Sequence, residues 1–266
     1  MHLKIWIYGA VLFCLICPST YAAYVAAPAI TKHTKIDILV EDAAPPWSKA
    51  DGTGYANDIV IAAFKEMGVK VNLNVVPYAR CKAMVLSGGV VACFSMTWLP
   101  TFEGLLKLAS QPLIVLNSDV FENIAKPLPK ASKGQCKLSK EMVAGVVNEY
   151  EYPPETMALN LEGVKFFKTR SDTQSLQMLA RSRLNAAIVI TNDMQPRNQK
   201  ARDAKIENKV QFAFNCGHET GSIGFSLKHE DGLWAYKTYE EGYSRIKKRG
   251  ELKRIGAKWF SLTEKF

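Results

Sequence analysis

Short apolar runs and amphipathic stretches alternate along the first third of the chain. Residues 35–40 (KIDILV) have the pattern of a buried strand, and a proline-containing loop that cannot be helical follows. The next segment has the periodicity of a helix capped by Asn57 or Asp58 and closed by Gly68. A strand at 69–76, a helix at 79–86 and a strand at 90–95 come next. This order predicts a parallel sheet covered by helices.

A second alternating region follows an apolar strand at 112–121 and a proline-lysine loop at 126–130, near which we place a crossing between two domains. A strand at 222–227 is expected to return to the first sheet, and two helices with apolar faces end the chain. The sequence therefore predicts an α/β protein of two domains. Between the crossings we expect strands at 142–147, 164–168, 186–190 and 210–214, a helix from Pro154, and a helix that opens with a capping box at 171–174.

The first residues have the layout of a secretory signal peptide. Lys4 gives a basic start, an apolar run follows, and small residues lie at the cleavage position, which we expect after Ala22 or Ala23. The apolar run is shorter than the roughly 20 residues that a membrane-spanning helix needs. The two cysteines of this segment follow large apolar residues rather than small ones, which argues against lipid attachment. We predict a signal peptide over residues 1–22 and a mature protein in the periplasm.

The basic balance of the chain does not by itself indicate a nucleic-acid partner. The formal net charge of +9 falls to +8 when Lys4 leaves with the signal peptide. Lysines and arginines are scattered except for a short run at 247–249, as on a solvated surface rather than a binding stripe. We expect neither a nucleic-acid partner nor a cofactor.

Four cysteines remain in the mature chain, and an even number in an oxidising compartment indicates two disulfides with three possible connectivities. The predicted helix descends about 10 Å from Cys81 to the glycine turn. The following strand climbs about 10 Å back to Cys93. The two sulfur atoms would lie at equal height, so Cys81–Cys93 is the preferred pair and Cys136–Cys216 remains. The cysteines lack CxxC spacing, so we expect no metal site.

Several short motifs occur in the order and at the spacing of one protein family. They are Pro45-Pro46-Trp47 after the first strand, Asp51-Gly52 leading to Gly54-Tyr55 and Asp58, Gly88 before the strand end from Ala92 to Thr97, Ser110 to Leu113, Leu184 to Ala187, and Gly250-Glu251-Leu252 with Lys258-Trp259. In these motifs, spread over nearly the whole mature chain, the sequence resembles the family 3 extracellular solute-binding proteins. The resemblance implies the two-lobed type II periplasmic binding protein fold, each lobe a mostly parallel sheet flanked by helices. Lobe 1 would comprise residues 35–119 and 221–266, lobe 2 residues 120–220, and two crossings would form the hinge.

The resemblance also implies a function. A small polar solute, amino-acid-like or an organic acid or amine, would be captured between the lobes, and the protein, as a monomer, would deliver it to the permease of an ABC-type transporter. Two alternatives stay open: a periplasmic sensing module for a membrane receptor, and a dehydratase-like enzyme in which Glu103, Glu149, Asp193 and His218 supply acid and base. The sequence contains neither a nucleophile motif nor a metal motif, so we expect no catalytic residues.

Side chains at or just after strand ends are the candidate ligand contacts, because ligands of open parallel sheets lie beyond the carboxyl ends of the strands. Amino-acid binders of the family carry an arginine soon after the strand-end threonine, but Glu103 stands at that place here. Arg80 could provide a substitute bidentate contact to a carboxylate, and either Asn192 or Asp193 could face the cleft. The predicted ligand-binding residues are Trp47, Tyr55, Arg80, Ser95, Thr97, Asn148, Tyr150, Asn192 and Asp193.

Overall fold

The structure is a computed structural model that describes residues 33–129 and 135–263. The predicted signal peptide lies outside these residues. The helices are α1 (Tyr55–Glu66), α2 (Tyr78–Ser87), η1 (Pro100–Phe102), α3 (Pro154–Leu161), α4 (Asp172–Ala180), α5 (Gln199–Asp203), α6 (Gly232–Lys248) and α7 (Glu251–Thr263). The strands are β1 (Lys35–Glu41), β2 (Ala43–Ala44), β3 (Ser48–Lys49), β4 (Lys70–Val76), β5 (Ala92–Met96), β6 (Leu106–Leu108), β7 (Ile114–Asn123), β8 (Val143–Val147), β9 (Lys165–Thr169), β10 (Ala186–Thr191) and β11 (Val210–Ser226).

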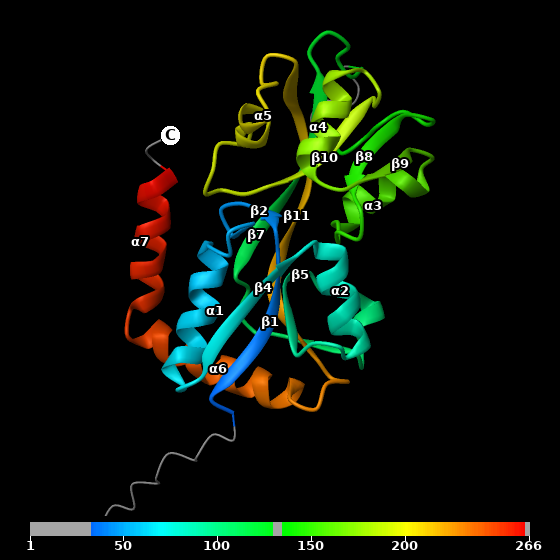
Figure 1. The fold of residues 1–266 in the computed structure, drawn as a ribbon. Coiled ribbons are helices and arrows are strands. Elements are labelled where there is room, and N and C mark those ends of the chain that lie inside the picture. Colours follow the sequence, from blue (N-terminus) through cyan, green and yellow to red (C-terminus); the bar gives the residue numbers. More distant parts are fainter. Residues whose placement is uncertain (1–32, 130–134, 264–266) are drawn as a thin grey trace, which may run out of the picture. The chain divides into compact units, whose positions relative to one another are not determined.

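Strands from both halves of the chain join in one ladder of order β4-β1-β5-β11-β7-β10-β8-β9, with β6 pairing to β11. At one end β4, β1 and β5 are parallel, and at the other β10, β8 and β9 are parallel. The long strands β7 and β11 pair antiparallel between these two groups (Figure 1). The parallel βαβ arrangement that the hydrophobic pattern predicts is thus present twice.

Alternating side chains on β1 divide the first group into two layers of core. Ile36, Ile38 and Val40 are buried in one hydrophobic cluster with α1, α6 and α7. Leu39 points to the opposite face, where its cluster includes residues of α2 and β5. Helices therefore cover both faces of these strands, which explains why the strand sequence is an almost continuous apolar run.

The second group follows the same rule. Ile188 of β10 is buried with Leu159 of α3 on one face, and the next residue, Val189, is buried with Leu176 of α4 on the other. The predicted capping box opens α4: Ser171 Oγ accepts a hydrogen bond from the Gln174 N–H at 3.2 Å. The glutamine side chain accepts in turn from the N–H of residue 170 at 2.7 Å.

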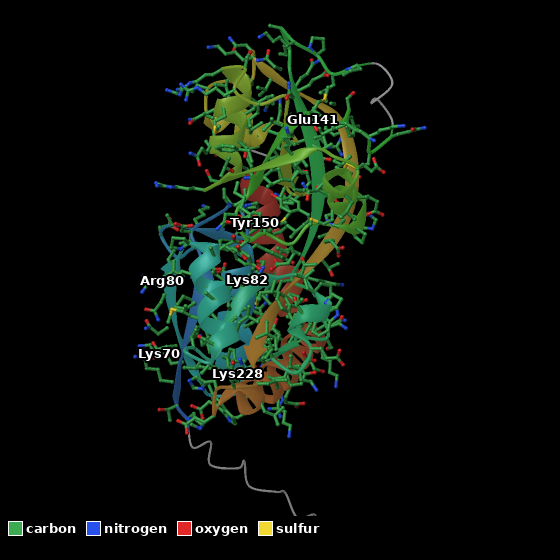
Figure 2. All side chains as sticks on the ribbon, turned by 90° about the vertical axis from the view of Figure 1, so that its right-hand side faces the viewer. Lys70, Arg80, Lys82, Glu141, Tyr150 and Lys228 are labelled. Atoms are coloured by element: carbon green, nitrogen blue, oxygen red, sulfur yellow. A yellow bond between two sulfur atoms is a disulfide. The ribbon has the colours of Figure 1, made fainter. Side chains whose placement is uncertain are left out.

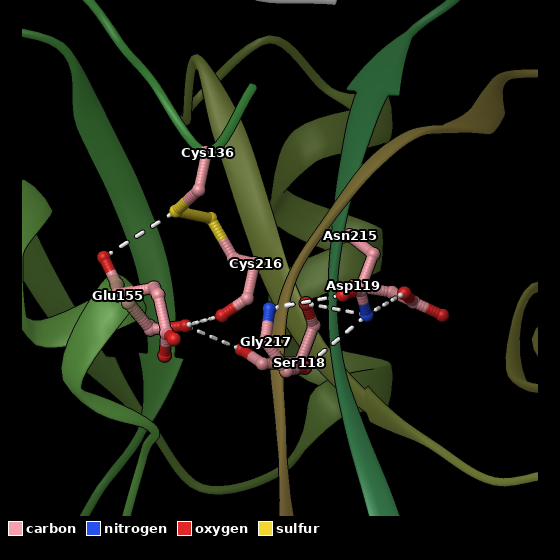
Figure 3. Close-up of a disulfide and its surroundings, with 8 residues drawn as sticks. Ser118, Asp119, Cys136, Glu155, Asn215, Cys216 and Gly217 are labelled. Carbon is pink, nitrogen blue, oxygen red and sulfur yellow. Dashed lines mark hydrogen bonds between the residues drawn. A yellow bond between two sulfur atoms is a disulfide. The ribbon is translucent and has the colours of Figure 1, made fainter. Parts of the chain in front are cut away.

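The two long strands carry a polar network where they pass between the groups. The carboxylate of Asp119 is fully buried and accepts a hydrogen bond from Asn215 Nδ2 at 2.9 Å (Figure 3). It also accepts a hydrogen bond from Thr191 Oγ1 at 2.6 Å, and Arg197 Nε lies 2.8 Å away. These contacts neutralise a charge that burial would otherwise make costly. They also fix β7 to β11 and β10 at the crossing.

Two details of the predicted elements are wrong. Residues 210–214 and 222–227 do not form separate strands, because β11 runs unbroken through the polar segment between them and absorbs it in two register shifts against β7. The first helix begins at Tyr55, not at an Asn57 or Asp58 cap. The Asn57 amide donates instead to the Gly52 carbonyl at 2.8 Å, outside the helix.

Both disulfides have the pairing preferred from the sequence. Cys81 of α2 is bonded to Cys93 of β5, and Cys136 is bonded to Cys216 of β11 (Figure 3). Within residues 33–129 and 135–263, no helix is long and apolar enough to cross a membrane. In the same part of the chain, no group of three or more His, Cys, Asp or Glu side chains could hold a metal ion.

Candidate functional site

A cavity with about 470 Å³ of empty space, part of it open to solvent, lies at the carboxyl ends of strands from both groups. Seven of the thirteen lining residues are apolar or aromatic, and the other six are two glutamates, a serine, a threonine, an asparagine and a lysine. The lining residues are Glu41, Ala44, Pro45, Trp47, Tyr78, Ser95, Thr97, Leu116, Tyr150, Glu151, Ile190, Asn192 and Lys200.

The loop between β1 and α1 places Trp47 against the cavity, and the residue is 5% exposed. Its main chain is tied to the start of α1, since the N–H of Tyr55 donates to the Pro46 carbonyl at 2.9 Å and the N–H of Ala56 to the Trp47 carbonyl at 3.1 Å. These bonds satisfy helix N–H groups that would otherwise lack partners. A Cβ at Gly54 would lie 1.9 Å from the Trp47 carbonyl oxygen, so only glycine fits there.

Glu41, the last residue of β1, contributes a carboxyl group that is buried in the cavity wall. Tyr150 Oη donates a hydrogen bond to Glu41 Oε2 at 3.1 Å. Burial raises the pKa of Glu41 from 4.5 to about 8, against a smaller lowering by the tyrosine bond and the charge of Lys200. Among the described residues, no lysine or arginine nitrogen lies within 4.0 Å of this carboxyl group.

A second acidic group is paired. Glu151 Oε2 accepts a hydrogen bond from Tyr78 Oη at 2.5 Å, and Glu151 Oε1 lies 2.9 Å from Lys82 Nζ. Lys82 Nζ also donates to the Glu149 backbone carbonyl at 2.9 Å. Burial raises the pKa of Glu151, and the ammonium of Lys82 opposes that rise. Figure 2 labels Lys82 on α2 and Tyr150 in the neighbouring loop.

The cavity's lysine is paired as well. Lys200 of α5 donates to the Asp172 carboxylate, at the start of α4, and to the Ile190 carbonyl at 2.6 Å. Both lysine and aspartate side chains are largely buried, 14% and 4% exposed. The charge of Lys200 is therefore compensated within the protein.

The strand-end hydroxyls differ in their hydrogen bonding. Thr97 Oγ1 donates to the Thr220 carbonyl at 3.2 Å. Ser95 Oγ is buried and, within the described residues, has no hydrogen-bond partner. A buried hydroxyl without a partner is costly, so a ligand that bonds to Ser95 would satisfy a group that the protein leaves open.

The predicted site residues fall into three groups in the structure. Five of them line the cavity: Trp47, Ser95, Thr97, Tyr150 and Asn192. Two others, Tyr55 and Asp193, line an adjacent shallow groove that also includes Trp47.

The remaining two, Arg80 and Asn148, are not among the residues that line the cavity. Arg80 is exposed on α2, toward the edge of the view in Figure 2. Glu103 is exposed too and does not line the cavity. Asn192 is thus the member of the Asn192–Asp193 pair that lies in the cavity wall, and Asp193 accepts a hydrogen bond from Asn117 Nδ2 at 3.0 Å.

Four polar lining residues escaped the sequence reasoning: Glu41, Tyr78, Glu151 and Lys200. Glu41 directly follows the apolar run of 35–40, so the strand-end rule that selected Trp47 should have included it. Tyr78 is the first residue of a helix, and Glu151 directly follows the predicted site residue Tyr150. Both positions indicate a role in the cavity less strongly than a strand end does. Lys200 lies on a five-residue helix, and no sequence pattern connects it to the cavity.

Solved structures with the same fold are numerous. The chain is similar to a histidine kinase sensor domain that resembles periplasmic binding proteins (16% identity, TM-score 0.69, covering 85% of this chain and 96% of that one). It is also similar to an ancestral arginine-binding protein bound to arginine (17%, TM-score 0.68, 86% and 99%). A third similar structure is an ABC uptake transporter substrate-binding protein of Streptococcus pneumoniae with bound histidine (16%, TM-score 0.67, 86% and 93%).

These similarities show the fold of this chain, which is the two-lobed type II periplasmic binding protein fold expected from the sequence. No protein-family model and no curated protein matches the sequence.

Proposed function

We propose that this protein is a periplasmic solute-binding protein that captures a small polar solute in the cavity and presents it to the permease of an ABC-type transporter. The main observation behind the proposal is that residues of both proposed lobes line the cavity. With lobe 1 as residues 35–119 and 221–266 and lobe 2 as residues 120–220, eight lining residues come from lobe 1 and five from lobe 2. A ligand in the cavity would touch both lobes and favour their closure.

Polar contacts between the proposed lobes support closure as the mechanism. Tyr150 of lobe 2 donates a hydrogen bond to Glu41 of lobe 1, and Tyr78 of lobe 1 donates one to Glu151 of lobe 2. Lys82 of lobe 1 forms an ion pair with the same Glu151 carboxylate. Opening the lobes would break all three contacts. The atoms of each contact lie within 3.1 Å of each other, so the contacts form only when the lobes are closed and contribute little to the stability of an open form.

A thermal-shift screen of the purified protein tests this function. Amino acids, amines, organic acids, short peptides and sugars would be added in turn, since a ligand at a hundred times its dissociation constant stabilises the folded state by about 2.7 kcal/mol. A shift with a ligand that is recovered unchanged supports binding. Absence of any shift across all classes would contradict it.

Two tryptophans provide a matched pair of variants. Trp47→Ala, in the cavity wall, should weaken binding at least tenfold. Trp98→Ala removes a tryptophan that is 49% exposed and does not line the cavity, and it should bind normally. Arg80→Ala tests the carboxylate contact expected from the sequence, and unchanged affinity would remove Arg80 from the proposed site.

A sensing module is the second candidate, favoured by the similarity to a histidine kinase sensor domain. The cavity would serve either role equally. Ligand-dependent stimulation of a reconstituted permease would support transport, while ligand-dependent binding to a receptor kinase would support sensing.

The dehydratase-like alternative has less support. Glu103, Glu149, Asp193 and His218, which the sequence offered as acid and base, do not line the cavity. Chemical conversion of a bound ligand by the purified protein would support this alternative.

A further inference from the structure

We propose that the solute is a small organic cation whose ammonium group binds against Glu41 and takes the place of a proton on that carboxyl group. This inference rests on the proposed function and names the ligand class of the same cavity. The exchange is balanced: the neutral carboxylic acid and the ammonium ion give an ion pair, and one proton leaves to solvent.

The ion pairs around the cavity show which acidic group is left without a cation. The ammonium of Lys82 is engaged by Glu151, and that of Lys200 by Asp172. Both cations are thereby neutralised by carboxylates. Glu41 is the acidic lining group that, among the described residues, lacks such a cation, and its one side-chain partner is the neutral Tyr150 hydroxyl. A buried carboxylate needs a counter-charge, and the cavity is where one can enter.

The remaining lining suits a cation. Trp47, Tyr78 and Tyr150 present aromatic rings, and the rings of Tyr78 and Tyr150 lie edge to face with centroids 5.2 Å apart. Aromatic faces attract ammonium groups, most strongly in places from which water is excluded. The unpaired Ser95 hydroxyl adds an oxygen that can accept a hydrogen bond from the ligand. No arginine lines the cavity within the described part of the chain, so a ligand carboxylate would meet no bidentate partner.

The carboxyl group of Glu41 carries the exchangeable proton because the group is buried. Tyr150, Lys200, Asp172 and Glu151 are the titratable groups that act on this carboxyl group. Together with burial they leave its pKa at about 8, so the empty protein holds a proton there at neutral pH. A bound cation favours the ionised form, and binding must then expel the proton. Below pH 8 the affinity for the cation should therefore rise about tenfold for each pH unit.

Calorimetry on the purified protein tests the proposal with three series of probes. The cations are ethylammonium, choline and 1,4-diaminobutane, the anions are propionate and succinate, and the zwitterions are alanine and arginine. Titrations at pH 7 in buffers of different ionisation enthalpy measure the protons released. We expect at least one cation to bind with release of close to one proton, and with an affinity that rises about tenfold from pH 6 to pH 7.

A matched pair of variants completes the test. Glu41→Gln keeps the size of the side chain and a hydrogen-bond acceptor for Tyr150, and it should lower cation affinity at least thirtyfold and abolish proton release. Glu103→Gln changes an exposed glutamate and should leave both unchanged. The proton count in the unaltered protein keeps the proposal testable even if Glu41→Gln fails to fold.

The outcomes separate this inference from the proposed function. Binding of anions alone, or cation binding without proton release, would overturn the inference and leave a solute-binding protein. Absence of binding by any probe, together with a silent thermal-shift screen, would overturn both.

Discussion

The buried carboxyl group of Glu41 should make the ligand-free protein lose stability as the pH rises. Its pKa lies at about 8 in the folded state, against an ordinary value of 4.5 in the unfolded chain. Between these values the folded state binds the proton and the unfolded state does not. Stability from this group is therefore fully present below pH 4.5 and is lost as the pH rises through 8. At about 1.4 kcal/mol per pH unit, the loss amounts to about 5 kcal/mol.

Glu41→Gln should remove this loss, because the amide is neutral at every pH and still offers Tyr150 an oxygen. Urea unfolding followed by tryptophan fluorescence would compare the two proteins at pH 5 and pH 8.5. We expect similar free energies of unfolding at pH 5 and a more stable variant at pH 8.5. Glu151, whose pKa burial also raises, is present in both proteins, so its contribution to their difference is small.

Glu103→Gln is the control, since this glutamate is exposed and should leave the pH profile unchanged. Parallel profiles for the unaltered protein and Glu41→Gln would refute the reasoning, because they would mean that Glu41 is ionised in the folded state at no cost. The same result would weaken the proton exchange proposed for ligand binding.

Three further changes have expected outcomes. Lys82→Met leaves the buried carboxylate of Glu151 without its cation and should destabilise the protein by about 3 kcal/mol in urea unfolding, with much of the loss recovered when Glu151→Gln is added. Gly54→Ala puts a methyl group 1.9 Å from the Trp47 carbonyl oxygen, so it should displace the Trp47 loop and lower ligand affinity at least tenfold in the thermal-shift assay. Unchanged affinity would show that the loop can move aside without disturbing the cavity. Alanine at both Cys136 and Cys216 opens a cross-link of 80 residues and should cost about 4.5 kcal/mol of unfolding free energy, measured with the other disulfide intact; a loss below about 1 kcal/mol would contradict this chain-entropy estimate.

Most of the fold could be predicted from local sequence patterns. Apolar runs such as residues 35–40 are strands because helices cover both faces of the sheet, and the helix–turn–strand geometry around Gly88 was sufficient to pair Cys81 with Cys93. Prediction failed where long-range pairing overrode local composition. The segment between Asn215 and Gly221 is polar and resembles a loop, yet hydrogen bonding to β7 keeps it within one strand.

The site was predictable only in part, for the same reason. The strand-end rule pointed to Trp47, Thr97 and Tyr150, which do line the cavity, because that rule depends on topology alone. It gave no indication that Lys200 would reach the cavity from a short helix. Nor could it show that Asp172 neutralises this lysine, since such pairing depends on packing between distant segments.

The route of the chain through β7 and β11 bears on how such a protein can change over evolutionary time. These strands pair antiparallel from Ile114 with Gly221 to Asn123 with Val210, and the N–H of Ile124 still donates to the Lys209 carbonyl at 3.0 Å. The chain therefore leaves and re-enters at neighbouring points, as it would at the tip of a hairpin. Everything between residues 124 and 209 is, in topological terms, one insertion. Recombination at this single place could exchange all five lining residues of that segment while the residues contributed by β1, the Trp47 loop and β5 are inherited unaltered.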